Sequence, residues 1–116
     1  MRTLLVTLLL CAFTTASSQI VVTHFNAPWN DHNKADWIGN LKGCDDIAYV
    51  NIVQCPEICK KHKIRTVPTI IIFKDGVEVK RFHGGLNFNV NREATESKIQ
   101  EIIYQLQPYP EKNPVL

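Results

Sequence analysis

The stretch VPTIIIFKDGVEVKRF, residues 67–82, decides the fold class. Two β-branched and aromatic runs, Thr69 to Phe73 and Val77 to Phe82, flank the tripeptide Lys74-Asp75-Gly76. An Asp-Gly pair between two apolar runs is a strong signal for the tight turn of a β-hairpin. The stretch therefore predicts two antiparallel strands, with a proline just before the first of them.

Two further strands are predicted upstream of this hairpin. The segments Ile20 to Phe25 and Ile47 to Ile52 are apolar and rich in β-branched residues, and neither shows a helical period. The first ends at Asn-Ala-Pro, a combination that favours a turn. Runs of this length and composition are typical of strands buried inside a sheet.

Three segments carry the signals of helices. The first starts at the N-cap candidates Asn30 or Asp31 and stops at Gly43. Its apolar residues share one helical face: Ala35, Ile38 and Leu41. The second runs from Pro56 to Lys63, with proline at a natural first position and basic residues at its end. In the third, apolar residues recur at i, i+3, i+4 and i+7: Ile99, Ile102, Ile103 and Leu106.

The order of these elements predicts an α/β fold. Strands and helices follow one another as β-α-β-α-β-β-α, which places parallel strands from crossover units before a final hairpin and helix. We therefore expect a mixed central sheet flanked by helices.

Several motifs make the chain resemble the thioredoxin superfamily. Phe25 to Lys34, which contains Ala-Pro-Trp-Asn-Asp-His-Asn-Lys, is similar to the active-site segment of protein disulfide isomerases with asparagine in place of both cysteines. Asn51 to Thr69 resembles the segment that leads to the family's cis-proline, here Pro68. Gly84-Gly85 resembles the turn before the last helix. The resemblance implies a minimal thioredoxin-like fold that lacks the strand and helix with which family members usually begin.

The same resemblance implies that dithiol exchange is lost at this site. Asn30 and Asn33 take the places of the nucleophilic and the resolving cysteine, and an amide cannot form a mixed disulfide. His24 corresponds to the family's buried acid, and Tyr49 to the lysine that often neighbours that acid. From the residues alone, Asn30 is equally well read as an N-cap, and Asn33 and His32 as solvated residues of the first helical turn. We predict no metal site and no other cofactor, because no spacing typical of zinc ligands occurs.

The two ends of the chain are read as segments outside the domain. Residues 1–18 have the parts of a signal peptide: a basic start, an apolar core from Leu4 to Phe13, and the small residues Ala16-Ser17-Ser18 at the cleavage site. The apolar core is too short to span a membrane, and the last four residues are not an ER-retention signal. We therefore expect the protein to pass through the ER lumen and to be secreted. Residues 19–107 then form one thioredoxin-like domain, followed by a flexible tail at 108–116.

The charge balance gives no indication of a nucleic-acid partner. The chain has 13 basic and 11 acidic residues, and removal of residues 1–18 takes away one basic residue, which leaves a net charge of +1. One basic cluster stands out: Lys60, Lys61, Lys63 and Arg65. We interpret it as a solvated helix end, since cations suit a helix C-terminus.

Three cysteines remain after removal of the signal segment, an odd number for an oxidising compartment. Cβ atoms four residues apart on a helix lie about 5–6 Å from each other, whereas a disulfide needs about 3.8 Å. A bond between Cys55 and Cys59 therefore requires a distorted first turn. Cys55 is expected at the N-cap, where the helix N-terminus would make it the most reactive thiol. Cys59 is interpreted as a small apolar residue facing the sheet, and Cys44 is either free or joined to another chain in a disulfide-linked dimer.

Two functional hypotheses follow. The first is a redox-inactive binding protein for a polypeptide, which would add by β-type pairing without a covalent step. The resemblance places five residues on the surface concerned: Trp29, Asn30, Val67, Pro68 and Gly84. The second is a thiol-disulfide oxidoreductase with a displaced site, in which Cys55 attacks and Cys59 resolves. Use of another surface stays open, since a fold does not fix a function. An exposed edge strand would also allow two copies to pair.

Overall fold

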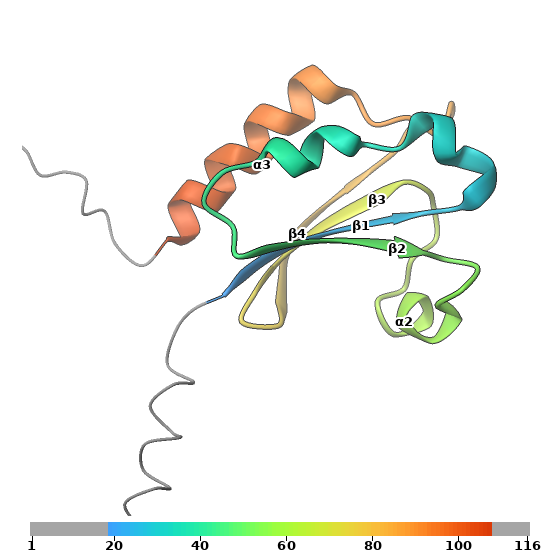
Figure 1. The fold of residues 1–116 in the computed structure, drawn as a ribbon, viewed down its shortest axis with the longest axis horizontal. Helices are drawn as coiled ribbons and strands as arrows, with labels where there is room; N and C mark the ends of the chain where they lie inside the picture. Colours follow the sequence, from blue (N-terminus) through green and yellow to red (C-terminus); the bar gives the residue numbers. More distant parts are fainter. Residues whose placement is uncertain (1–18, 108–116) are drawn as a thin grey trace, which may run out of the picture.

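The computed structural model describes residues 19–107, whose strands and helices follow the predicted order (Figure 1). The four strands are β1 (Ile20–Asn26), β2 (Asp46–Asn51), β3 (Thr69–Lys74) and β4 (Val77–His83). The helical segments are the 3-10 helices η1 (Pro28–Asn33) and η2 (Asp36–Asn40) and the α-helices α2 (Pro56–Lys61) and α3 (Arg92–Leu106). The expected signal peptide and C-terminal tail lie outside the described residues. Within residues 19–107, no helix has both the length and the apolar character needed to cross a membrane.

The strands form one mixed sheet in the order β2-β1-β3-β4. β1 runs parallel to β2 and antiparallel to β3, and β3 runs antiparallel to β4. In the final hairpin Lys74 pairs with Val77, and the two residues between them, Asp75 and Gly76, have φ angles of 53° and 83°. Two positive φ angles are the mark of the type I′ turn that the Asp-Gly pair favours. The predicted α/β fold and its hairpin are confirmed.

The single helix predicted after β1 is wrong, because two short 3-10 helices take its place. Ala27, not Asn30 or Asp31, precedes the first turn, and Asn30 itself has the non-helical angles φ −109° and ψ 21°. Residues 36–40 are Asp, Trp, Ile, Gly and Asn, most of which are weak helix formers. The predicted burial was nevertheless right for all three apolar positions: Ala35, Ile38 and Leu41.

Two predicted helix ends also shift. Gly43 has the expected positive φ of 85°, but η2 already ends at Asn40. The sequence predicts that α2 reaches Lys63, whereas it ends at Lys61. Lys63 has a φ of 54°, which a right-handed helix cannot accommodate.

One face of the sheet carries the main core. Figure 1 shows the 3-10 helices and α3 on the same side of the sheet, and α2 on the other. Apolar side chains from β1, β3, η2 and α3 meet in this layer: Ile20, Val22, Ile70, Ile72, Trp37, Ile38, Ile99 and Ile103. Burying a side chain of this size contributes about 1.5–3 kcal/mol to folding. Within the sheet Phe25 pairs with Thr69, so the end of β1 lies beside the start of β3.

Candidate functional site

Three asparagines form a hydrogen-bonded cluster at the C-terminal end of β1. Asn30 Nδ2 donates to Asn26 Oδ1 at 2.9 Å and to the Phe88 carbonyl oxygen at 3.0 Å. Asn33 Nδ2 donates to Asn30 Oδ1 at 2.9 Å, and Asn26 Nδ2 donates to the Asn30 carbonyl oxygen at 3.0 Å. Asn30 is only 1% exposed. The asparagine cluster therefore joins β1, η1 and the loop before α3 in the interior of the domain.

This environment corrects the sequence-based interpretations of Asn30. It is not an N-cap, because its side chain bonds to Asn26 and Phe88 rather than to the N–H groups of η1. Nor is its side chain open to a ligand, because it is buried. His32 is exposed and Asn33 is partly buried. Chemically, the cluster offers amide hydrogen bonds and no nucleophile.

His24 is buried on β1, next to the link between the two 3-10 helices. Its Nε2 accepts a hydrogen bond from the Ala35 N–H at 3.0 Å, and its ring centroid lies 5.3 Å from that of Tyr49. Burial, and after it the positive charge of Lys34, lowers the pKa of His24 to about 4. The Lys34 Nζ itself lies 4.6 Å from the centroid of the Tyr49 ring. His24 is therefore neutral near pH 7, and its Nε2 lone pair is already used within the protein.

An apolar groove of about 550 Å³ lies next to the asparagine cluster. Most of its wall consists of residues from η1, from the loop before β3 and from the loop before α3, among them Trp29, Ile64, Val67, Gly84, Leu86 and Phe88. The Trp29 and Phe88 rings meet edge to face with centroids 5.1 Å apart. Trp29 is 61% exposed, Phe88 45% and Leu86 100%. Large apolar side chains grouped this openly are typical of a surface that meets a partner.

Three of the five predicted surface residues line this apolar groove: Trp29, Val67 and Gly84. Pro68, joined to Val67 by a cis peptide bond, is buried behind them. The Gly84 N–H donates to the Pro68 carbonyl oxygen at 2.9 Å, and a Cβ on Gly84 would lie 2.6 Å from Pro68 Cδ. Only glycine allows this close approach. Asn30 lies under the surface and does not line the groove.

The backbone N–H and carbonyl groups of Val67 are unpaired in the described part of the chain. Within residues 19–107, neither its N–H nor its carbonyl oxygen has a hydrogen-bond partner. Val67 as a whole is 6% exposed and lines the groove. Because one donor and one acceptor stand at the edge of an apolar groove, an extended chain can pair with Val67 as a strand pairs with a sheet edge.

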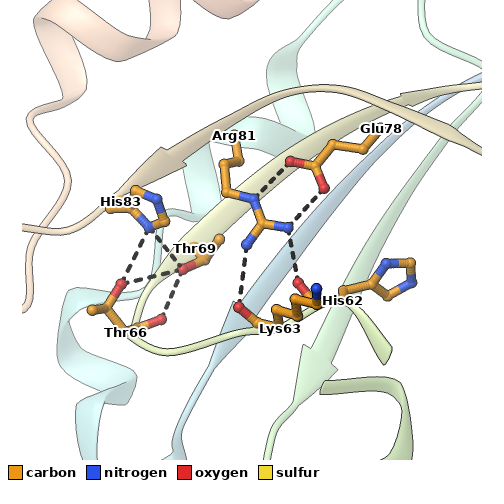
Figure 2. A network of polar contacts seen from close by, with 7 residues as sticks. All are labelled: His62, Lys63, Thr66, Thr69, Glu78, Arg81 and His83. Atoms are coloured by element: carbon orange, nitrogen blue, oxygen red, sulfur yellow. Dashed lines mark hydrogen bonds and ion pairs between the residues drawn. The ribbon is translucent and has the colours of Figure 1, made fainter. Parts of the chain in front are cut away.

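Arg81 of β4 holds the loop that carries this wall of the groove (Figure 2). Its Nη2 donates to the His62 carbonyl oxygen at 2.8 Å, and its Nη1 to the Lys63 carbonyl oxygen at 3.4 Å. Both carbonyl groups lie past the end of α2, where no further helical turn supplies an N–H donor. The same guanidinium bonds both carboxylate oxygens of Glu78, at 2.6 and 2.7 Å. These bonds hold the pKa of Glu78 below its usual value.

Hydroxyl groups fix the next residues of this loop, as Figure 2 also shows. Thr69 Oγ1 donates to the Thr66 carbonyl oxygen at 2.7 Å, and Thr66 Oγ1 lies 3.2 Å from His83 Nδ1. Arg81 and these hydroxyls attach residues 62–66 to β3 and β4. The wall of the groove formed by Ile64 and Val67 is therefore built on the sheet.

The three cysteines in the described part of the chain are free thiols. Cys55 stands at the N-cap of α2, as predicted, and is half-buried. Burial raises the pKa of Cys59, and so does the neighbouring Cys55. Burial also raises the pKa of the Cys44 thiol. Both shifts reduce the thiolate fraction near neutral pH.

Sequence reasoning missed Phe88 and Leu86, the two exposed apolar residues of the groove that lie in the loop before α3. Phe88 has a φ of 61°, which is uncommon for a bulky residue. The signal was present, because two large apolar residues occur in the otherwise polar stretch Gly-Gly-Leu-Asn-Phe-Asn. Without a helical or strand period, however, these residues fitted no predicted element.

Comparisons with known proteins agree with the fold. A family model described as thioredoxin matches residues 12–100. Thioredoxin M-type, chloroplastic, from Triticum aestivum is 35% identical over 66 residues, which cover 48% of this chain and 35% of that protein. The matched part thus spans about a third of that relative's length.

Solved structures give the same result for the fold. The reduced Schistosoma mansoni thioredoxin pre-protein superposes with a TM-score of 0.60 at 21% identity, over 85% of this chain and 90% of that one. Fasciola hepatica thioredoxin gives a TM-score of 0.55 at 26% identity, over 77% of this chain and 82% of that one.

Proposed function

The chain belongs to the thioredoxin family, and from this premise we propose that it is a secreted, redox-inactive member that binds a polypeptide noncovalently in the apolar groove. In this reading it resembles the domains of protein disulfide isomerases that hold clients without exchanging disulfides. The expected signal peptide at residues 1–18 is the basis for secretion. N-terminal sequencing of protein recovered from the medium of expressing cells would give a first residue near Gln19.

The observation that carries the proposal is the apolar groove with the unpaired backbone of Val67 on its wall. A bound chain would satisfy the Val67 N–H and carbonyl group and would place an apolar side chain against the Trp29 and Phe88 rings. Each large side chain removed from water contributes about 1.5–3 kcal/mol. Two or three such contacts, reduced by the entropy lost on binding, suit a weak and reversible complex.

Loss of redox activity is supported by the asparagine cluster. Asn30 and Asn33 stand where the resemblance places the two cysteines, and their side chains are joined by a 2.9 Å hydrogen bond. This hydrogen bond joins the two side chains, but two amides cannot exchange electrons as a dithiol and a disulfide do. His24, neutral near pH 7, replaces the acid that assists proton transfer in redox members.

The alternative, a displaced dithiol site at Cys55 and Cys59, has less support. Resolution of a mixed disulfide requires a thiolate, and burial raises the pKa of Cys59. The thiols are also separated by one turn of α2, with the Cys59 N–H donating to the Cys55 carbonyl oxygen at 3.3 Å. That helical bond would have to break for a disulfide to form.

Calorimetric titration with a thiol-blocked polypeptide tests the proposed function. Insulin B chain with carboxamidomethylated cysteines provides an unfolded, apolar ligand that cannot exchange disulfides. Replacement of Phe88 by alanine removes one wall of the groove and should weaken binding about tenfold or more. Val77→Ala is the matched control, since Val77 is 66% exposed on the far hairpin. No binding by the native protein, or equal binding by both variants, would refute the proposal.

A further inference from the structure

A second hollow, of about 480 Å³, adjoins the apolar groove and is basic. The two share Ile52, Ile64 and Arg65 in their linings, so they lie side by side. Beyond this shared wall, the second hollow is lined by Lys60 and Lys63. A ligand that leaves the apolar groove on this side therefore meets three cations within a few residues of chain.

No acidic side chain among the described residues lines either hollow. The ion pairs recorded in this part of the chain join other residues, and none involves Lys60, Lys63 or Arg65. All three basic side chains are exposed. Their charge is thus unpaired and directed at solvent along the edge of an apolar surface.

The loop that displays these charges is held in a defined shape. Arg81 donates hydrogen bonds to the carbonyl oxygens of His62 and Lys63. Lys63 itself adopts a left-handed conformation, just after the end of α2. A solvated helix end needs no such attachment to the sheet. The helix-end interpretation holds for Lys60 and Lys61, which lie in the last turn of α2, whereas Lys63 and Arg65 follow on the loop that Arg81 bonds to the sheet.

From this charge pattern we infer the partner class: an extended, acidic polypeptide segment in which a large apolar residue is followed or preceded closely by aspartate or glutamate. The inference rests on the proposed function of the apolar groove. Arg65 is two residues from Val67, a separation of about 7 Å along an extended chain. A ligand paired with Val67 thus brings a side chain two residues from its apolar anchor close to Arg65, and side chains further along close to Lys63 and Lys60.

Three acetylated decapeptides with a central Leu-Phe-Leu test the inference. They differ only in the residues on both sides, which are aspartate, serine or lysine. Trp29 reports binding through its fluorescence, because it is 61% exposed in the groove, whereas Trp37 is 7% exposed in the core. Exposed ion pairs contribute little each, so three of them should make the aspartate peptide bind about fivefold to tenfold more tightly than the serine peptide.

Added salt and charge variants test whether the preference for the aspartate peptide is electrostatic and whether it comes from these basic residues. Raising the salt from about 20 mM to about 300 mM shortens the screening length severalfold and should remove most of this preference. The double variant Lys60→Gln, Lys63→Gln removes the two cations that line the second hollow only, so it should reduce the preference for aspartate over serine to about twofold while keeping the native affinity for the serine peptide. Lys98→Gln is the matched control, because Lys98 is an exposed lysine of α3, on the opposite side of the sheet from α2.

The outcomes distinguish the two proposals. Equal affinity for all three peptides, or tightest binding of the lysine peptide, would overturn the acidic partner class and leave the binding function intact. Preference for aspartate that persists undiminished in the double variant would overturn the assignment to this cluster. Failure of every peptide to bind, together with failure of the thiol-blocked insulin chain, would overturn both proposals.

Discussion

Replacement of Asn30 by alanine tests the role of the asparagine cluster. The side chain of Asn30 takes part in three hydrogen bonds, to Asn26, Phe88 and Asn33. Alanine removes all three and leaves the Asn26 carboxamide oxygen without its donor at a position only 8% exposed. It also removes the donor to the carbonyl oxygen of Phe88, a residue with a left-handed backbone conformation.

The size of the effect follows from these contacts. A hydrogen bond contributes about 1 kcal/mol net, and a buried acceptor left without a donor costs about 1–3 kcal/mol. We therefore expect Asn30→Ala to lower the free energy of unfolding by about 2–4 kcal/mol. For a domain of this size, that corresponds to a fall in Tm of about 10 °C or more.

Urea and thermal unfolding followed by circular dichroism measure this change. Asn40→Ala is the matched control, because Asn40 is exposed at the end of η2, and a surface substitution without contacts changes stability by about 0.5 kcal/mol or less. Binding of the thiol-blocked insulin chain should also weaken, because Phe88 loses the hydrogen bond from Asn30. If Asn30→Ala were as stable as Asn40→Ala, the cluster would not organise this site, and the reasoning would be refuted.

Three further predictions concern pH, the Arg81 contacts and the thiols. The pKa of His24 falls from 6.5 in the unfolded chain to about 4 in the fold, so the unfolded state binds more protons between these values and the free energy of unfolding should drop by about 3 kcal/mol from pH 7 to pH 4. The drop should be smaller for His24→Gln, and identical pH profiles of the two proteins would contradict this prediction. Arg81→Ala should cost about 1–3 kcal/mol and speed amide exchange in residues 62–66, with unchanged exchange as the contrary result. In the insulin reduction assay the native protein and Cys55→Ala should both match the uncatalysed rate, and activity lost only in the variant would establish a displaced thiol site.

Local patterns in the sequence were sufficient to predict the sheet. The Asp75-Gly76 turn and the β-branched runs beside it are contiguous signals, and the hairpin they predict is present. The strand ends differ from the predictions by about one residue, as expected for frayed ends. The start of α3 was missed, although Asn91 caps it by accepting a hydrogen bond from the Ala94 N–H.

The site was less predictable, because its contacts join distant residues. Asn30 was read as a helix cap from its local preference, but a partner 58 residues away, the Phe88 carbonyl, helps to turn its side chain inward. Lys63 and Arg65 were interpreted as part of a helix end, but they follow α2 on a loop whose carbonyl groups Arg81 bonds to the sheet. Both features depend on tertiary contacts that no periodicity encodes.

Whether polypeptide binding is noncovalent and located in the apolar groove is tested most directly by calorimetric titration of a variant in which the three cysteines of residues 19–107, Cys44, Cys55 and Cys59, are replaced by serine. We expect this variant to bind thiol-blocked insulin B chain with an affinity within about twofold of the native protein, because no thiol lines the apolar groove among the described residues. Loss of binding in this variant would contradict that expectation and would show that the thiols, not the groove, carry the function.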